Sequence, residues 1–277
     1  MSDLSFLDFM TDLDSPGVAT AHDEVSLWSA MFGLLMLEEI PLAGIRTALD
    51  VGCGTGFPLI ELAERLGAAA DVHGVDVWAG GLSRAAEKIQ ARGTPNVTLH
   101  TCDAVELPFA DASFDLVVSN VGINNFEDRP AVLVECRRVL RTGGTIALTT
   151  NPKGHMQELY TLFEELLRHD DDALERLAAH VAHRATAREV ASILDESGFT
   201  VRRIVERQQT MRFATGTAFL DHYFIKLGFL DGWRSIVDAA EHRSIFTALR
   251  RRLDEISTCE GEVRMTIPLA YVEASAT

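Results

Sequence analysis

The sequence is poor in basic residues. Its 277 residues include 25 lysines and arginines against 41 aspartates and glutamates, which gives a formal net charge of −16. Proteins that bind nucleic acid need basic surfaces to displace the counterions of the phosphate backbone. The charge therefore excludes nucleic acid as an expected partner and, less strongly, disfavours an anionic membrane.

Cysteine is also scarce. The four residues, Cys53, Cys102, Cys136 and Cys259, form no CxxC pair, and none has a histidine at zinc-site spacing. We therefore expect no metal site and reduced, mostly buried thiols. Thiol capture of a soft metalloid is an alternative that the wide spacing supports poorly.

Long apolar runs are absent as well. The longest, residues 27–37, is far shorter than the roughly 20 residues needed to cross a bilayer. The acidic start, MSDLSFLDFMTDLDSPG, lacks the basic region of a signal peptide. We expect a cytoplasmic protein without stable membrane insertion, and the sequence gives no indication of its oligomeric state.

The middle of the chain alternates between strand and helix patterns. Runs such as DLVVS and TIALTT are continuous and β-branched, as in strands buried on both faces. Repeated β–α units imply a parallel sheet with right-handed crossovers. We expect an α/β fold with a doubly wound, Rossmann-like, mostly parallel seven-stranded sheet. Its first strands are expected at 47–51, 71–77, 96–102, 114–119 and 144–149. The helices between them are expected at 58–66, 81–92 and 129–140, with Pro58 in a first turn and RTGG at 141–144 as a stop and turn.

The distal pattern differs. We expect helices at 154–169 and from Thr186, which starts a capping box with Glu189, then a strand at 199–207. A helical insert at about 214–257 precedes a last strand at 262–274. Within the insert, one helical stripe is apolar and consists of Ile245, Leu249, Leu253 and Ile256. Three arginines lie mostly off this stripe, at positions 250–252. They form either a solvated face or a docking surface for an acidic partner or substrate tail.

The N-terminal region supplies a second helical cap. The segment 22–40 reads as one helix that is apolar nearly all round and therefore buried on more than one side. It either packs only on the sheet's helices or also covers a ligand. The expected organisation is an N-terminal helical lid over 1–44 and a main domain over 45–277.

A glycine-rich turn follows the first strand in TALDVGCGTGFPLIELAERLG. Its pattern is Gly52-x-Gly54-x-Gly56. The dinucleotide fingerprint would need a third glycine where Phe57 stands, and the Gly-Lys-Ser/Thr ending of a phosphate loop is absent. The turn therefore predicts close approach of a ligand to the backbone, without clear provision for a diphosphate.

Three aspartates stand at or just after successive strand ends. Asp50 precedes the glycine turn, Asp76 ends the second strand, and Asp103 follows the third. A carboxylate at position 50 suits a cationic ammonium group, one at position 76 suits ribose hydroxyls, and one at position 103 suits an exocyclic amine of adenine. Each alone is often only a cap, but the set indicates a ligand with an ammonium, a ribose and an adenine.

These features together resemble the class I S-adenosylmethionine-dependent methyltransferases. LDVGCGTG, GVDV, CDAVELPFADASFDLVVSN and ECRRVLRTGGTIAL occur in the order and at the spacing of that family, over roughly residues 48–150. The resemblance implies S-adenosylmethionine as methyl donor and S-adenosylhomocysteine as product. The donor-binding residues it implies are Asp50, Gly52, Cys53, Gly54, Gly56, Asp76, Val77, Trp78, Asp103, Ala104 and Asn120. One departure is the GINNF segment after the fourth strand, where many relatives carry a histidine. If that histidine carries a proton in those relatives, Asn124 and Asn125 cannot replace it in this role.

The distal region is more weakly similar to quinone-biosynthesis C-methyltransferases and to malonyl-thioester O-methyltransferases. We expect methyl transfer to a small or medium, largely apolar metabolite at an O, N or C atom. Candidate pocket residues are Trp28, Phe32, Asn124 and Tyr223, and the segments 25–37 and 219–233 are expected to cover the acceptor. An alternative is that these segments form only a helical core.

A general base would assist a hydroxyl or phenol acceptor. Candidates are His155, Tyr160 and His22, followed by His222 and Tyr223, although each could equally be a surface or packing residue. Three alternative functions stay open. They are non-methyl chemistry with S-adenosylmethionine, a non-catalytic protein that binds it, and methylation of a protein or carrier-bound substrate.

Overall fold

The structure is a computed structural model, and it describes residues 4–10, 12, 15–24 and 27–277. The chain divides into two compact units. The sheet unit comprises Leu13–Pro152, Thr186–Arg207 and Leu269–Thr277, and the helical unit comprises Met1–Asp12, Lys153–Ala185 and Gln208–Pro268.

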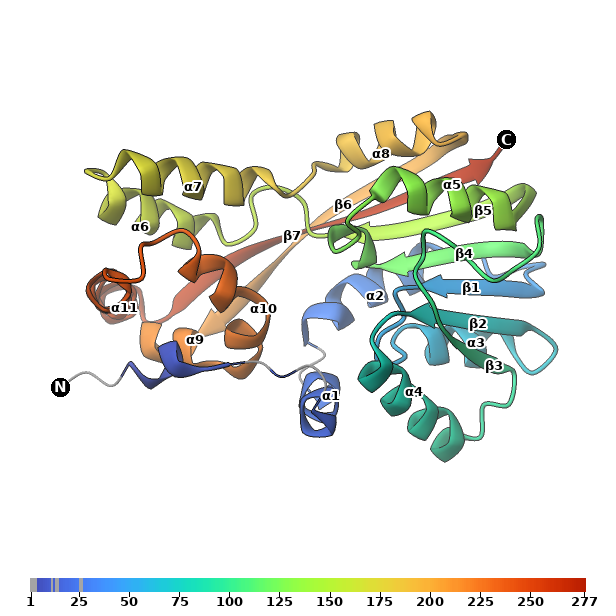
Figure 1. Ribbon diagram of the computed structural model, residues 1–277, viewed down its shortest axis with the longest axis horizontal. Coiled ribbons are helices and arrows are strands. Elements are labelled where there is room, and N and C mark those ends of the chain that lie inside the picture. The colour runs from blue at the N-terminus through green and yellow to red at the C-terminus, as the bar shows by residue number, and fades with distance from the viewer. Residues whose placement is uncertain (1–3, 11, 13–14, 25–26) are drawn as a thin grey trace. The chain divides into compact units, whose positions relative to one another are not determined.

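A seven-stranded sheet has the order β3-β2-β1-β4-β5-β7-β6 (Figure 1). The β1–β2, β2–β3, β1–β4 and β4–β5 pairs are parallel, and β5–β7 is antiparallel. The predicted mostly parallel, doubly wound sheet is thus confirmed. The strands are β1 (Thr47–Val51), β2 (Asp71–Asp76), β3 (Val97–Thr101), β4 (Phe114–Asn120), β5 (Leu140–Thr150), β6 (Phe199–Phe213) and β7 (Val263–Ala276).

The strand order reverses between β1 and β4, the two central strands. From β1 the chain proceeds to β2 and β3 on one side, and from β4 to β5 on the other. Right-handed crossovers then put α5 on one face and α3 on the other, and ligands bind such sheets at the carboxyl ends of the strands beside the reversal. The crossover helices are α3 (Leu59–Leu66), α4 (Ala79–Arg92) and α5 (Arg129–Val139), and α8 (Ala187–Glu196) precedes β6.

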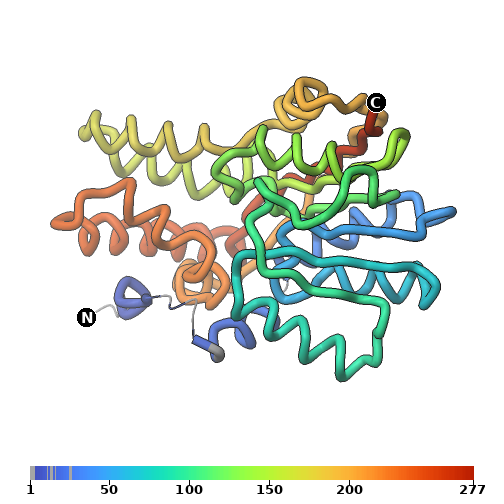
Figure 2. The backbone as a smooth tube through the Cα atoms, turned by 45° about the vertical axis from the view of Figure 1, so that its right-hand side comes forward, coloured from blue at the N-terminus to red at the C-terminus, as the bar shows by residue number. Residues whose placement is uncertain are grey.

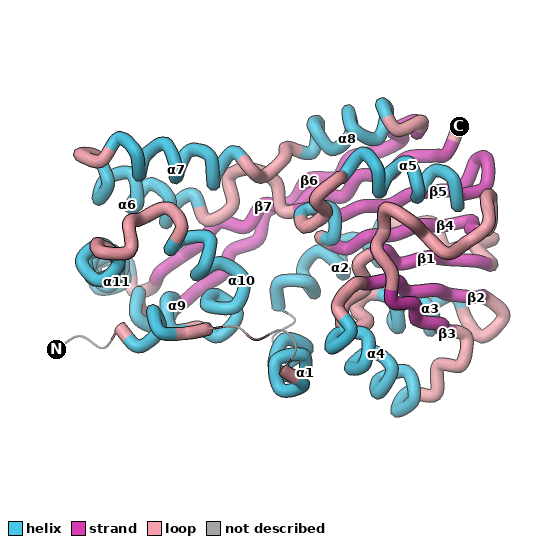
Figure 3. The backbone as a smooth tube through the Cα atoms, viewed as in Figure 1, coloured by secondary structure: helices cyan, strands magenta, loops and turns pink. Residues whose placement is uncertain are grey.

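The helical unit is built mainly from helices (Figure 3). Helices α6 and α7 lie side by side as a hairpin (Figure 2). The long strands β6 and β7 contribute residues to both units, and the segment between them is helical. The elements are η1 (Ser5–Asp8), α6 (Gln157–Leu167), α7 (Asp171–Ala182), α9 (Gly216–Asp221), α10 (Tyr223–Arg234) and α11 (His242–Glu260).

The sequence predicts one N-terminal helix from His22, whereas the structure has two helices in this region, α1 (Pro16–Glu24) and α2 (Leu27–Glu39). Residues 25–26 of the predicted lid lie outside the described residues. The apolar character of α2 has a plain cause, because it contacts β4 and β5 and buries side chains such as Met36.

Two local predictions were wrong. RTGG at 141–144 belongs to β5, and Gly143 (φ +79°) lies near an irregular register between β4 and β5. Helix α3 begins at Leu59, so Pro58 is its N-cap and not its first residue. The helix before RTGG, expected to end at residue 140, ends at Val139.

The predicted arginine face on α11 also needs correction. Arg250 is buried, with 8% of its surface exposed. Arg251 is exposed, and Arg252 forms ion pairs with Glu165 and Glu255 at 3.1 Å. The three arginines therefore do not form one solvated face.

Candidate functional site

The glycine turn leaves β1 at the strand-order reversal. The Gly52 and Cys53 N–H groups donate to the carbonyl of Val75 at 2.9 and 3.1 Å. Gly52, Gly54 and Gly56 have φ values of +79°, +52° and +93°. Residues with a side chain rarely adopt these values, which explains why glycine stands at each position. The Cys53 thiol is buried, and burial raises its pKa, so its contribution to this turn is through the backbone.

Asp50 lies near the end of β1, two residues before Gly52. Its side chain is fully buried, and neither carboxylate oxygen makes a hydrogen bond of normal geometry within the described residues. Burial, followed by the nearby negative charge of Asp76, raises the pKa of Asp50 to about 8, and the backbone N–H of Leu59 opposes the shift. An unsatisfied buried carboxylate is costly, and a cation removes the cost. The site therefore fits a ligand that brings positive charge.

Asp76 ends β2 and holds the turn from the other side. Its carboxylate accepts hydrogen bonds from the Gly54 N–H at 2.7 Å and from the Trp78 N–H at 2.8 Å. These bonds fulfil the capping role expected of a strand-end aspartate, and each carboxylate oxygen can accept a further bond from a ligand hydroxyl. Val77, next to it, is 68% exposed.

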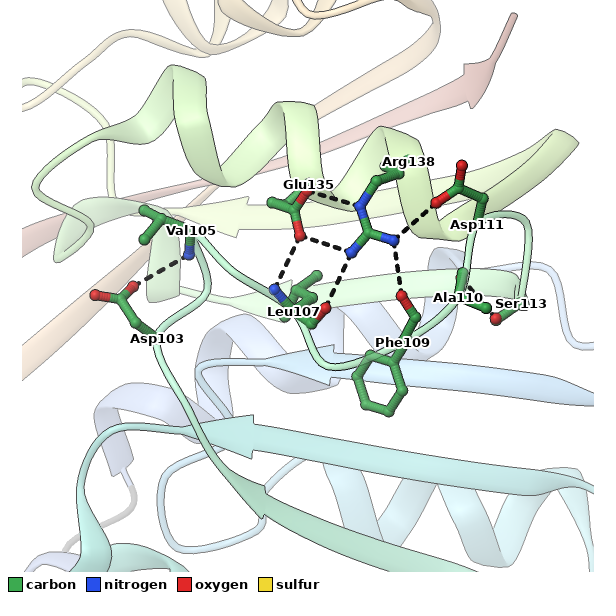
Figure 4. A network of polar contacts seen from close by, with 9 residues as sticks. All are labelled: Asp103, Val105, Leu107, Phe109, Ala110, Asp111, Ser113, Glu135 and Arg138. Carbon is green, nitrogen blue, oxygen red and sulfur yellow. Dashed lines mark hydrogen bonds and ion pairs between the residues drawn. The ribbon is translucent and has the colours of Figure 1, made fainter.

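The loop after β3 carries Asp103 and Ala104. Asp103 is exposed and accepts from the Val105 N–H at 3.1 Å, whereas Ala104 is buried. The rest of this loop is fixed by Arg138 of α5 (Figure 4). The guanidinium donates to the carbonyls of Leu107 and Phe109, to Asp111 and to both carboxylate oxygens of Glu135 at 2.7–2.9 Å, and Glu135 accepts from the Leu107 N–H.

A cavity of about 520 Å³ opens beside these elements within the sheet unit. Among its described lining residues there are four carboxylates and no lysine or arginine, which disfavours a diphosphate ligand. The lining joins predicted donor-site residues from three loops with residues 125–128 after β4, which the sequence did not predict as site residues. The lining residues are Gly52, 75–77, 102–105, 125–128, Ala131 and Val132.

The end of β4 is held by a buried amide network. Asn120 donates to the carbonyl of Ser29 in α2 at 3.0 Å and accepts from the Thr149 hydroxyl at 2.7 Å. Asn124 accepts from the Thr150 hydroxyl at 2.6 Å and donates to Asn151. Between them, Val121 has φ +64°, which is unusual for a β-branched residue and is the kind of strain that concentrates at functional sites.

The N-terminal candidates lie in the sheet unit. Trp28 and Phe32 of α2 are buried, with ring centroids 5.4 Å apart. The ring of His22 in α1 contacts the edge of Trp78, at a centroid distance of 5.4 Å. Burial lowers the pKa of His22, against the opposing charge of Asp23, and its Nδ1 atom is buried without a hydrogen-bond partner.

The remaining candidates lie in the helical unit. The Tyr160 hydroxyl lies 3.3 Å from His155 Nε2 and 3.1 Å from His180 Nε2, and it accepts a long hydrogen bond from the Trp233 indole. Burial lowers the pKa of His155 to about 3, assisted by the charges of Arg184 and His180. The structure thus brings His155 and Tyr160 together as a buried pair.

Two other candidates from the helical unit are less enclosed. Tyr223 is partly exposed, and its ring makes an edge-to-face contact with the ring of Phe9, with 5.7 Å between the ring centroids. Burial, followed by the charge of Lys226, lowers the pKa of His222.

Other sites receive no support from the described part of the chain. It contains no group of three or more histidine, cysteine and carboxylate side chains placed to hold a metal ion. Cys53 and Cys136 are buried, whereas Cys259 is exposed. None of the described helices is long and apolar enough to span a bilayer.

Residues 46–208, more than half of the chain, match a family model described as a methyltransferase domain. The chain therefore belongs to this family and, with its sheet and strand order, is a class I S-adenosylmethionine-dependent methyltransferase. It is similar to the demethylmenaquinone methyltransferase of Geobacillus kaustophilus, with 35% identity over 165 residues, 56% of this chain and 70% of the relative.

Two further similarities concern other acceptors. The arsenite methyltransferase of Halobacterium salinarum is 30% identical over 172 residues, 61% of this chain and 41% of that protein. The solved structure of Haemonchus contortus phosphoethanolamine N-methyltransferase 2 with S-adenosyl-L-methionine has a TM-score of 0.57 to this chain and 19% sequence identity. The match covers 99% of this chain and 60% of the Haemonchus chain. At that identity the likeness establishes the fold alone.

Proposed function

We propose that the donor binds at the glycine turn, with its ammonium group toward Asp50, its ribose toward Asp76 and its adenine toward Asp103 and Ala104. The observation that carries this proposal is the buried, unsatisfied carboxylate of Asp50 beside a turn with three left-handed glycines. The adjacent 520 Å³ cavity, with its four carboxylates, supports a cationic ligand without phosphate.

We propose that the acceptor is a small or medium, largely apolar and quinone-like metabolite. Similarity to a demethylmenaquinone methyltransferase supports this class. An arsenite acceptor is less well supported, because the described residues contain no group of three or more cysteine, histidine and carboxylate side chains placed to bind a metal ion. Cys53 lies in the turn after β1, Cys102 in the loop after β3 and Cys136 in α5. The segment 219–233 as a cover for the acceptor stays a prediction.

When bound, S-adenosylmethionine supplies an electrophilic methyl group on a sulfonium. The task of the chain is to align the acceptor with that methyl group in line and to exclude water. Asp50 would neutralise the ammonium, the 52–56 turn would fix the donor through its backbone, and Asn120 would hold α2 at the end of β4. The acceptor proton leaves to a base or to solvent as the methyl–acceptor bond forms and the methyl–sulfur bond breaks.

Calorimetry tests the donor site. Asp76→Ala removes acceptors for ribose hydroxyls and should weaken S-adenosylhomocysteine binding about 10- to 150-fold, or on the order of 1.5–3 kcal/mol. Asp71→Ala, at the opposite end of β2, is the matched control and should leave affinity unchanged. Binding of NAD in place of S-adenosylhomocysteine, or equal affinity of both variants, would contradict the site.

Labelled donor tests the acceptor. The enzyme is incubated with methyl-labelled donor and a cell lysate divided into small organic-soluble, small polar and macromolecular fractions. Label in the organic-soluble fraction, with a product one methyl group heavier than a quinol by mass spectrometry, is the expected result. Label confined to macromolecules after extraction would favour a protein or carrier substrate instead.

A further inference from the structure

Val121 follows β4 in a left-handed conformation. Its φ is +64°, a value that a β-branched residue rarely adopts, so other contacts must hold the backbone there. Val121 is the N-cap of η2 (Gly122–Asn124), a single short turn, and the Asn125 N–H donates to the carbonyl of Gly122 at 2.8 Å. The conformation of Val121 therefore sets the direction in which the chain leaves the sheet.

Thr149 of β5 is the residue that holds Val121. The Val121 N–H donates to the carbonyl of Thr149 and to its hydroxyl oxygen, each at 3.1 Å. The same hydroxyl donates to Oδ1 of Asn120 at 2.7 Å, so it joins two consecutive residues at the end of β4. Thr149 is fully buried and is the parallel register partner of Asn120. Because a threonine hydroxyl has one proton and two lone pairs, it can make both bonds at once, whereas a methyl group can make neither.

The turn that Val121 starts packs on the end of β1. The Ser119 hydroxyl donates to the carbonyl of Val51 at 2.6 Å. A Cβ atom added at Gly122 would collide with Ser119 Oγ and would lie 3.1 Å from the same carbonyl oxygen of Val51. A Cβ atom added at Gly52 would lie 3.6 Å from the Cα atom of Gly122. The two backbones are therefore in close contact where the glycine turn of the donor site begins.

The same turn supplies one wall of the donor cavity. Residues 125–128 line this cavity together with Gly52. The ring of Phe126 would lie 3.2 Å from a Cβ atom at Gly122 and 3.8 Å from one at Gly52, so the ring packs beside both glycines. A change of direction at Val121 would therefore move this wall relative to the glycine turn.

We propose that Thr149 is a positioning residue for the methyl donor. Its hydroxyl keeps Val121 left-handed, and the turn that follows keeps the wall of residues 125–128 at the distance from the glycine turn that the donor requires. Thr149 is not one of the described residues that line the cavity, so it acts through Val121 and not by contact. This inference rests on the donor site proposed above. Because coupling between two equilibria is reciprocal, bound donor should also hold Val121 more firmly.

Calorimetry with S-adenosylhomocysteine tests the hydroxyl. Thr149→Val replaces it by a methyl group and should raise Kd about 10-fold. Thr149→Ser keeps the hydroxyl and should bind like the wild type. Thr145→Val makes the same exchange four residues earlier in β5, beside Leu116 of β4, and should also bind like the wild type.

A second substitution tests the route through Val121. Glycine adopts a positive φ without strain, so a glycine at position 121 should not need the hydroxyl to stay left-handed. We expect the double variant Thr149→Val/Val121→Gly to regain most of the lost affinity, although Asn120 still lacks its bond from position 149. Wild-type Kd in Thr149→Val, or no recovery in the double variant, would overturn the proposal.

Kinetics and hydrogen exchange separate positioning from general stability. We expect Thr149→Val to raise KM for the donor with a smaller change in kcat, whereas a purely structural role would lower the melting temperature and leave KM unchanged. In the wild type, S-adenosylhomocysteine should slow exchange of the Val121 amide and of residues 122–126. If Thr149→Val does not fold, unchanged exchange of these amides on binding would overturn the proposal.

The Asp76→Ala variant distinguishes this inference from the donor site itself. Weakened binding in Asp76→Ala with normal binding in Thr149→Val would reject only the role of Thr149. Normal binding in both would reject the donor site.

Discussion

Asp50 shows how one residue can tie donor binding to pH. Its pKa in the folded protein, about 8, is raised above the ordinary value near 3.9. Its protonated form therefore favours the folded state at low pH, and this contribution is lost as pH rises through about 8. A cation bound beside it would favour the ionised form and lower that pKa.

We expect the affinity for S-adenosylmethionine to increase between about pH 6 and 8, by up to tenfold per pH unit. Calorimetry near pH 7 in two buffers of different ionisation enthalpy should show release of up to one proton. Adenosine, which lacks the ammonium, serves as the control ligand and should release none. Asp50→Asn should abolish both the proton release and the pH dependence; release that persists in this variant would assign the proton elsewhere.

Tyr160 illustrates the difference between a buried polar cluster and a catalytic one. His155 beside it has a pKa of about 3, so it is a weak base at neutral pH. Tyr160→Phe would leave the Trp233 indole and imidazole groups without their hydroxyl partner. We expect a loss of about 1–3 kcal/mol in the free energy of unfolding by urea, with kcat of the folded enzyme changed by less than about threefold. A drop of about 100-fold in kcat without loss of stability would instead support the base predicted from the sequence.

At the scale of elements, Arg138 fixes the loop that carries Asp103 onto α5. A planar guanidinium can serve two carbonyls and two carboxylates at once, whereas an ammonium cannot reproduce that fork. Arg138→Lys should therefore loosen residues 103–113, with faster hydrogen exchange there and donor affinity reduced several-fold.

The matched control is Arg141→Lys. Arg141 also pairs with an aspartate, Asp115, but it stands outside this network and is more exposed. It should leave exchange at 103–113 and donor affinity unchanged, because exposed ion pairs contribute little. Equal effects of the two substitutions would contradict a specific role for the Arg138 network.

The elements that sequence alone predicted well are those with strong local signals. Strand β1 was expected at its observed bounds. The predicted Thr186–Glu189 capping box starts α8, and both of its reciprocal hydrogen bonds between side chain and backbone are formed. RTGG failed because two glycines indicate a turn locally, whereas the segment belongs to β5, at the register shift opposite Phe114 and Leu116 of β4. The position of Asp50 was predictable from its place before the glycines, but its lack of partners and its raised pKa depend on packing from other elements.

Contacts between distant segments were beyond the sequence reading. Nothing in the pattern around Asp23 indicates that it accepts from Arg84 and Lys88, 61 and 65 positions further along the chain, and the lining of the cavity by 125–128 depends on where β4 ends. These are properties of the tertiary structure. The cofactor class was predictable because the donor motifs are local, and the acceptor was not.

At the scale of the whole chain, the match to the family ends at residue 208. The helices α9, α10 and α11 lie outside it, so the family match carries no information about them. Relatives of comparable identity are named for a quinone and for arsenite, which shows that the shared part does not determine the acceptor. Direct assays must therefore decide it.

The net charge of −16 predicts how fast the enzyme reaches an apolar acceptor that is dissolved in a lipid bilayer. Such a compound would be presented in lipid vesicles, and a strongly acidic protein is repelled by an anionic surface over a Debye length of about 30 Å at 0.01 M salt. Methylation of a quinol in zwitterionic vesicles should then be at least about threefold faster than in vesicles rich in anionic lipid. The difference should vanish near 0.5 M salt, where screening is nearly complete at that range. Donor affinity, as the control, should be the same in the presence of either kind of vesicle. Faster methylation in anionic vesicles at low salt would show that a local basic surface, and not the total charge, governs the encounter.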